Sequence, residues 1–180
     1  SLDGFCSLTT GIPQVLAVHD LAFLHYPNFI AKHHLWFYKM HQKKFLNKAK
    51  AVVTVSNFSK QDIVKHYKID ERKINIVYNA ARDVFKPVEE RTKHEIKQHY
   101  SRGHEYFLFV GGVHPRKNLM RLIKAFSIFK KRQLSSMKLL VVGRLAWQYD
   151  DIVEKLKTYK YRDDVILLDY LPDNELAKVT

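Results

Sequence analysis

The sequence has very little cysteine, no long apolar run and no leader-like start. The single cysteine, Cys6, excludes an internal disulfide framework and a cysteine-rich zinc site, which suits a reducing compartment. No apolar run approaches the roughly 20 residues that a membrane-spanning helix needs. The opening residues, SLDGFCSLTTG, lack the basic-then-apolar order of a signal peptide. Together these features predict a cytoplasmic protein.

Acidic residues are also scarce relative to basic ones. The chain has 18 Asp and Glu against 31 Lys and Arg, a net charge of +13 that implies anionic partners. Many cations lie along a predicted helix over residues 29–47, interleaved with Trp and Phe. This helix is either a solvated face or a surface that docks on an anionic membrane or an anionic acceptor.

The order of apolar segments predicts an α/β fold. Short apolar runs of strand length alternate with segments of helical periodicity, which is typical of parallel, doubly wound sheets. The predicted strands cover residues 14–18, 51–55, 74–78, 106–110, 138–142 and 165–168. The predicted helices cover 29–47, 56–67, 91–100, 118–132, 150–159 and a last one from Pro172.

The periodic pattern stops between Val84 and Glu90, where Pro87 and a charged run intervene. We therefore predict two incomplete Rossmann-like domains, over residues 1–87 and 88–180. The chain begins without methionine and ends at LAKVT inside a helical pattern. We expect it to be a fragment of a longer polypeptide.

The stretch YFLFVGGVHPRKNLMRLIKAF, which starts at Tyr106, carries the clearest chemical signal. A buried strand ends at Gly111 and Gly112, where the missing Cβ atoms let a ligand approach the backbone. A helix is predicted to begin near Asn118, so its N–H groups and positive dipole end would face the same crevice as Arg116 and Lys117. The pattern favours an anionic group, although an ordinary strand-to-helix loop can also contain it.

Two other strand ends carry candidate residues. His19 follows the first predicted strand, at the edge where open α/β sheets bind ligands, but it could equally be a loop histidine bonded to local backbone. Asp20 either orients His19 or caps the next turn. Gly143 closes another strand and either brings backbone near a ligand or serves as a plain turn residue. The histidines show no metal-ligand spacing, so no metal site is predicted.

Six ordered blocks of the chain resemble glycosyltransferase family 4, the retaining GT-B enzymes that use nucleotide-sugar donors. The blocks are IPQVLAVHDLAFLHYP, AVVTVSNFSKQDIV, INIVYNAARDVFKP, YFLFVGGVHPRKNLMRLIKAF, LLVVG and VILLDYLPDNEL. The resemblance implies an acceptor-side domain over residues 1–87 and the first part of a donor-binding domain over 88–180.

The resemblance also implies roles for individual residues. Lys117 matches the family's phosphate-contacting lysine, and His19 matches a histidine that contacts the donor sugar. Gly112 stands where the family often has an arginine, a charge that Arg116 could supply instead. The segment around Leu171 would pass beside the nucleotide base, contacting it or only packing in the core.

The implied function is transfer of a hexosyl group, with mannose as one candidate, from a UDP- or GDP-sugar to a saccharide or lipid-linked acceptor. Transfer would proceed with retention of configuration and without a cofactor, in bacterial surface polysaccharide biosynthesis, at the inner face of the membrane. The family's second donor-side signature, an acidic pair, would lie beyond residue 180, so we expect this fragment alone to be inactive.

Two other classes stay open. The basic excess would suit a nucleic-acid-binding module, but the aromatic residues lie within apolar strands and helix faces rather than in a stacking row between cations. A non-catalytic interaction protein could also retain this fold. Tight, salt-sensitive binding to random-sequence DNA or RNA, without a response to UDP or GDP, would favour the nucleic-acid module.

Overall fold

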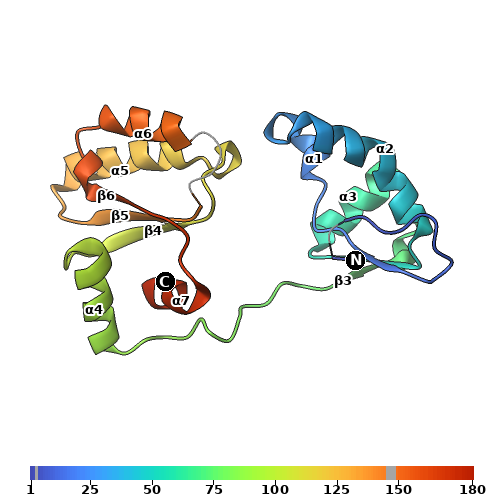
Figure 1. Cartoon of the computed structure of the whole chain (residues 1–180), viewed down its shortest axis with the longest axis horizontal. Helices are drawn as coiled ribbons and strands as arrows, with labels where there is room; N and C mark the ends of the chain where they lie inside the picture. The colour runs from blue at the N-terminus through green and yellow to red at the C-terminus, as the bar shows by residue number, and fades with distance from the viewer. Residues whose placement is uncertain (3, 145–148) are drawn as a thin grey trace. The chain divides into compact units, whose positions relative to one another are not determined.

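The computed structural model describes every residue except 3 and 145–148. The chain divides into two compact units, Ser1–Ala80 and Ala81–Thr180, and each is described by itself (Figure 1). Residues 77–89, between the last strand of the first unit and the first helix of the second, form no helix or strand. Among the described residues, no helix is both long enough and apolar enough to cross a membrane.

The first unit is built on a three-stranded parallel sheet. Its strands β1 (Val15–Ala17), β2 (Ala51–Thr54) and β3 (Ile74–Ile76) lie in the order β1-β2-β3. Val52, on the central strand, is opposite Leu16 on one side and Ile74 on the other. All three side chains are buried in one core with Ile63. The sheet therefore delivers the carboxyl ends of its strands, including the segment after β1, to one edge.

The helices of the first unit are α1 (Ala22–His25), α2 (Lys32–Lys48) and α3 (Asn57–Tyr67), with short 3₁₀ turns η1 (Pro27–Phe29) and η2 (Glu71–Lys73). The sequence predicted one helix from residue 29, but α2 begins at Lys32. Pro27 begins η1 instead, because its fixed φ and missing N–H suit a first turn. Ser56 caps α3 as predicted, since its Oγ accepts a hydrogen bond from the Ser59 N–H at 3.1 Å.

The second unit contains another parallel sheet, of β4 (Tyr106–Val110), β5 (Lys138–Val142) and β6 (Val165–Leu168). Its helices are α4 (Glu90–Ser101), α5 (Leu119–Gln133), α6 (Tyr149–Lys157) and α7 (Asp173–Val179), with 3₁₀ turns η3 (Pro115–Lys117) and η4 (Arg162–Asp164).

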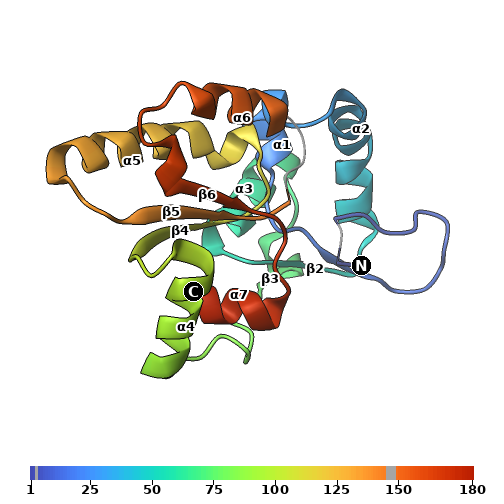
Figure 2. The same cartoon turned by 60° about the vertical axis from the view of Figure 1, so that its left-hand side comes forward.

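Helices cover both faces of the β4-β5-β6 sheet. Helices α5 and α6 lie on one face, and α4 and α7 lie on the other (Figures 1 and 2). Leu139 of β5 packs with Ile123 of α5, whereas its neighbour Leu140 packs with Ile96 of α4 and Val179 of α7. The central strand is buried on both sides, which explains its unbroken apolar sequence. The predicted doubly wound α/β fold is confirmed.

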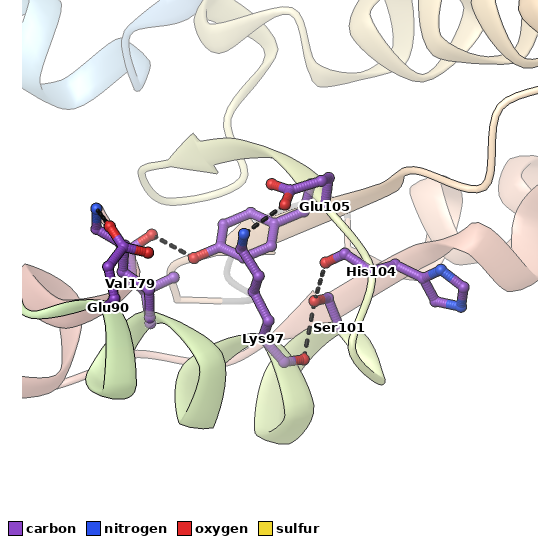
Figure 3. Close-up of polar contacts among 8 residues, drawn as sticks. Glu90, Lys97, Ser101, His104, Glu105 and Val179 are labelled. Atoms are coloured by element: carbon purple, nitrogen blue, oxygen red, sulfur yellow. Dashed lines mark hydrogen bonds and ion pairs between the residues drawn. The ribbon is translucent and has the colours of Figure 1, made fainter.

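Polar contacts fix α4 to its neighbours (Figure 3). The Lys97 ammonium pairs with Glu105, just before β4. The buried Ser101 hydroxyl lies 2.9 Å from the Lys97 carbonyl oxygen and within reach of the His104 carbonyl. The Tyr106 hydroxyl donates to the Val179 carbonyl at 2.8 Å, so β4 is also fixed to the end of α7.

The end of α5 carries a buried ion pair. Lys130 is 5% exposed, and its ammonium lies 2.8 Å from Oδ2 of Asp164 and also donates to the Met137 carbonyl at 3.1 Å. Lys138 pairs with the other carboxylate oxygen. Burial raises the pKa of Asp164, but the hydrogen bonds from Lys130 and Lys138 outweigh it and hold the pKa below its ordinary value.

Within the described ranges of the chain, three helices end on residues in the left-handed region that are not glycine. Lys68 follows α3 with φ of 57°, Arg102 follows α4 with φ of 56°, and Leu134 follows α5 with φ of 47°. Helices commonly close in this conformation, but usually on glycine because a Cβ atom is strained there.

Candidate functional site

The carboxyl end of β4 forms a tight glycine turn. The Gly111 N–H donates to the Val142 carbonyl at 2.8 Å, and the Val113 N–H donates to the Arg144 carbonyl at 3.2 Å. Gly143 has a φ of +150°, and a Cβ atom there would lie 2.3 Å from the Gly111 carbonyl oxygen. Gly143 therefore allows two backbone segments to approach each other closely, which no other residue type could do without displacing them.

The Lys117 side chain lies over this glycine turn. A Cβ atom built on Gly111 would sit 3.6 Å from the Lys117 Cε atom and 3.8 Å from its Nζ atom. Lys117 closes η3, where its N–H donates to the His114 carbonyl at 2.8 Å. The short 3₁₀ turn therefore directs an ammonium group back to the end of β4, at the carboxyl edge of the sheet.

Arg116 and Asn118 flank Lys117 and are both exposed. The Arg116 N–H donates to Nδ1 of His114 at 3.2 Å, but no ion pair fixes its guanidinium group among the described residues. Asn118 has a φ of 56° and precedes α5 without a side-chain capping bond. The helix thus begins where the sequence predicted, after a left-handed residue that turns the chain into it.

A cavity of about 440 Å³ opens beside the glycine turn. Its lining includes Gly111, Gly112, Gly143 and Leu171, all of which the sequence had singled out. Leu171 also packs beside the core of Ile96, Leu140 and Val179, so the packing role expected as one alternative is present, while contact with a nucleotide base stays a prediction. Arg116 and Lys117 are not among the lining residues, and the Lys117 side chain borders the turn instead.

Two arginines that the sequence reasoning missed line this cavity. The Arg144 guanidinium lies 5.7 Å from the centre of the Tyr170 ring, and Arg82 pairs with Asp173. Arg144 directly follows Gly143, so an arginine after a strand-ending glycine was an available signal. No sequence pattern places Arg82 at the cavity, because its contact with Asp173 depends on tertiary structure.

The chemistry of this cavity suits an anionic ligand with a planar part. Arginine binds phosphate oxygens in a bidentate manner, and the ammonium of Lys117 adds a point charge at the strand end. Tyr170 is more than half exposed, so one side of its ring is available for stacking. Exposed backbone at Gly112 permits close approach of a ligand.

In the first unit, His19 lies between two cavities at the carboxyl edge of the β1-β2-β3 sheet. It borders one of about 330 Å³ and another of about 160 Å³. Its Nε2 atom lies 3.3 Å from the carbonyl oxygen of Leu2, so its backbone contact is with the N-terminal segment and not with the adjacent loop. Asp20 accepts a hydrogen bond from the Ala22 N–H at 2.8 Å and thereby caps the turn into α1.

Buried polar side chains line both of these cavities. Gln42 is 1% exposed and borders the larger cavity, and its Nε2 atom has no partner among the described residues. Thr54 is 2% exposed and borders the smaller one, and its Oγ1 atom is likewise unpartnered there. An unpaired buried polar group is costly, so both positions suit a ligand rich in hydroxyl groups. Sequence reasoning missed both residues because each lies within a regular helix or strand.

Comparison with protein families accounts for both units. Residues 90–180 match the model of glycosyl transferases group 1, and residues 3–82 match the model of glycosyltransferase family 4. The chain belongs to the glycosyl transferases group 1 family. The predicted resemblance is confirmed.

Two curated bacterial proteins are similar to this glycosyl transferases group 1 chain. It is 25% identical over 164 residues to O-antigen chain mannosyltransferase B of Escherichia coli, covering 90% of this chain and 43% of the relative. It is 30% identical over 165 residues to O-antigen chain mannosyltransferase RfbU of Salmonella typhimurium, covering 91% and 41%. The chain therefore spans less than half the length of these curated relatives.

Solved structures of GT-B glycosyltransferases share the fold. WaaG, a glycosyltransferase involved in lipopolysaccharide biosynthesis, matches with a TM-score of 0.71 at 16% identity, over 93% of this chain and 48% of that one. Anabaena HepE, solved in complex with UDP and glucose, matches with a TM-score of 0.68 at 16% identity, over 93% and 44%. At such low identity these likenesses show the fold alone.

Proposed function

We propose that this chain is part of a hexosyltransferase of bacterial surface polysaccharide biosynthesis. Its substrates would be a nucleotide-sugar donor and a saccharide or lipid-linked acceptor. The observation that carries this proposal is the Lys117 ammonium over the Gly111 turn, beside a cavity lined by Arg82 and Arg144. Both curated relatives are named as O-antigen mannosyltransferases, which makes mannose the favoured hexose.

The donor diphosphate would occupy the second unit. When the bond between sugar and phosphate breaks, the leaving diphosphate gains negative charge. Cations and backbone N–H groups fixed near it lower the barrier, because they stabilise that charge most strongly in the transition state. Lys117 and Arg116 would act on this charge. Gly111, Gly112, Asn118, Gly143 and Leu171 would shape the donor pocket, with UDP or GDP as the nucleotide.

The sugar chemistry would involve the first unit. His19 borders two cavities that are each lined by a buried polar side chain with no hydrogen-bond partner in the described part of the chain, which suits saccharide hydroxyl groups. Retention of configuration and transfer without a cofactor remain our predictions. In this scheme the positive charge for the leaving group comes from the chain's own lysine and arginines.

A panel of UDP-, GDP- and ADP-sugars with the full-length protein tests the proposal. Ligand binding to the native state raises the melting temperature, so one nucleotide class should give a clear shift. Lys117→Ala should weaken that binding about tenfold or more, because a charge-assisted hydrogen bond contributes about 1.5–3 kcal/mol. Lys124→Ala is the matched control, since Lys124 is an exposed lysine on α5. Equal binding by wild type and Lys117→Ala would contradict the proposal.

We also propose that α2 contacts an anionic membrane from the cytoplasmic side. The helix carries no Asp or Glu, and its exposed residues include Lys39, Lys43, Lys44 and Trp36. Cations with an exposed aromatic side chain are the pattern of an interfacial helix.

Sedimentation with vesicles of phosphatidylglycerol and phosphatidylcholine tests this contact. The double variant Lys43→Ala/Lys44→Ala should lose about tenfold or more in affinity, at about 1 kcal/mol for each lysine near the surface. The double variant Lys65→Ala/Lys124→Ala removes the same charge from α3 and α5 and should bind like wild type. Equal loss in both variants would indicate that net charge, not α2, determines binding.

A further inference from the structure

Three side chains with metal-ligating atoms come together in the first unit. His25 ends α1, while Asp62 and His66 lie one turn apart on α3. His25 Nε2 lies 2.7 Å from Asp62 Oδ2, and His66 Nε2 lies 3.3 Å from Asp62 Oδ1. The two imidazole rings meet edge to face, with centroids 5.4 Å apart. The two helices therefore aim two imidazole nitrogens at opposite oxygens of one carboxylate.

The spacing of these atoms fits a single small cation. The three ligand atoms all lie within 4.8 Å of one another. Two nitrogen atoms on one zinc ion are at most about 4.2 Å apart, because each Zn–N bond is about 2.1 Å. Small side-chain rotations therefore suffice to bring all three atoms onto one ion.

The carboxylate of the cluster is buried, whereas its two imidazole rings are partly exposed to solvent. The Asp62 side chain is 9% exposed, whereas His25 and His66 are 38% and 36% exposed. A buried carboxylate gives the ion a fixed charge to bind, while the open rim leaves a coordination position for water.

The donor set selects the kind of ion. Two imidazole nitrogens and one carboxylate oxygen are ligands for zinc and its first-row neighbours, whereas magnesium and calcium prefer oxygen ligands alone. Asp62 could also hold both imidazoles through hydrogen bonds without any ion. The two arrangements differ in one measurable respect, which is stoichiometric binding of a transition ion.

We propose that His25, Asp62 and His66 bind one divalent transition-metal ion, with zinc as the reference ion, that ties α1 to α3. Residues 18–21 connect β1 to α1, so the ion would fix the segment that carries His19. Its role would be structural. The site is independent of the proposed sugar transfer, because neither its residues nor its chemistry enter that reaction.

Metal binding is tested on untagged protein that has been dialysed against a chelator. Calorimetric titration with zinc should give one ion for each chain, and cobalt should give the visible absorption bands of nitrogen-ligated Co²⁺. His66→Ala and His25→Ala should each weaken zinc binding about tenfold or more. The control His33→Ala/His34→Ala removes two exposed histidines of α2 and should leave the single site intact. Zinc should raise the melting temperature of wild type but not of the two site variants.

Several outcomes would overturn the proposal. They are a wild-type chain that binds no zinc, a site variant that binds zinc like wild type, or a preference for magnesium over zinc. The cobalt spectrum tests nitrogen ligation in wild type itself, so the test does not depend on the variants folding. Absence of metal binding would leave Asp62 as a hydrogen-bonded link between two helices, and it would not affect the proposed glycosyl transfer.

Discussion

At the scale of single residues, Gly143 and Gly112 differ although both line the same cavity. A Cβ atom on Gly143 would collide with the Gly111 carbonyl carbon at 2.5 Å and with the Gly112 nitrogen at 3.0 Å. A Cβ atom on Gly112 would meet only the Arg144 carbonyl oxygen, at 3.8 Å, which is ordinary contact. The turn therefore requires glycine at position 143, whereas position 112 has room for a Cβ atom.

Gly143→Ala should destabilise the second unit by about 2 kcal/mol or more, because it combines a steric clash with a strained φ. Gly112→Ala, the matched control, should change stability by less than about 0.5 kcal/mol. Urea denaturation followed by circular dichroism measures both. Similar stabilities for the two variants would mean that the close approach between Gly143 and Gly111 does not constrain the turn.

Some site residues follow from the sequence alone, and others do not. Gly143 directly follows β5, and Lys117 lies in the loop between β4 and α5, so the topology places both at the carboxyl edge of the sheet. The Gln42 amide and the pair of His25 with Asp62 depend on how helices pack, which local pattern does not reveal. Asp62 and His66 are four residues apart on a predicted helix, and this spacing was the one signal of their shared face.

At the scale of elements, strands and helices were largely predictable because their apolar spacing is regular. The helix α5 begins after Asn118 and buries Leu119, Ile123 and Phe126, as its periodicity predicts. The short α1 was not predicted, because four residues are too few to show a period. The buried Lys130 at the end of α5 was also unexpected, since cations there usually remain in solvent.

The Asp164 link between α5 and β5 should be a major contributor to the stability of the second unit. Asp164→Ala would leave the buried Lys130 ammonium without its charged partner, so we expect a loss of about 3 kcal/mol. Asp163→Ala is the control, because its side chain is 89% exposed. Urea denaturation at neutral pH compares the two.

The pH dependence of that loss follows from the pKa of Asp164. Its folded-state pKa is lowered, so its contribution to stability is present above the unfolded pKa and is lost as pH falls through the folded value. The difference in the free energy of unfolding between wild type and Asp164→Ala should therefore be largest at neutral pH and should decrease below about pH 4. A difference in the free energy of unfolding that stays constant down to pH 2 would indicate that the variant loses packing rather than a charge interaction.

At the scale of the whole chain, the division into two units predicts where proteases cut. Residues 77–89 form no regular element, and Tyr78 is 73% exposed. Brief chymotrypsin treatment should cleave first after Tyr78, because exposed backbone outside helices fits a protease site most readily. Phe58 is equally exposed but lies within α3, so it is the internal comparison. Cleavage first at Phe58 would show that α3 opens more easily than this connecting stretch.

The non-glycine helix ends at Lys68, Arg102 and Leu134 are positions where glycine would raise the melting temperature. Each holds a side chain in a backbone conformation that glycine adopts freely, and the Leu134 side chain is 87% exposed, so it recovers little by packing. None of the three borders the cavities described above. Glycine replacements at these positions offer a way to stabilise the protein for crystallisation or assay without changing the residues that line its cavities.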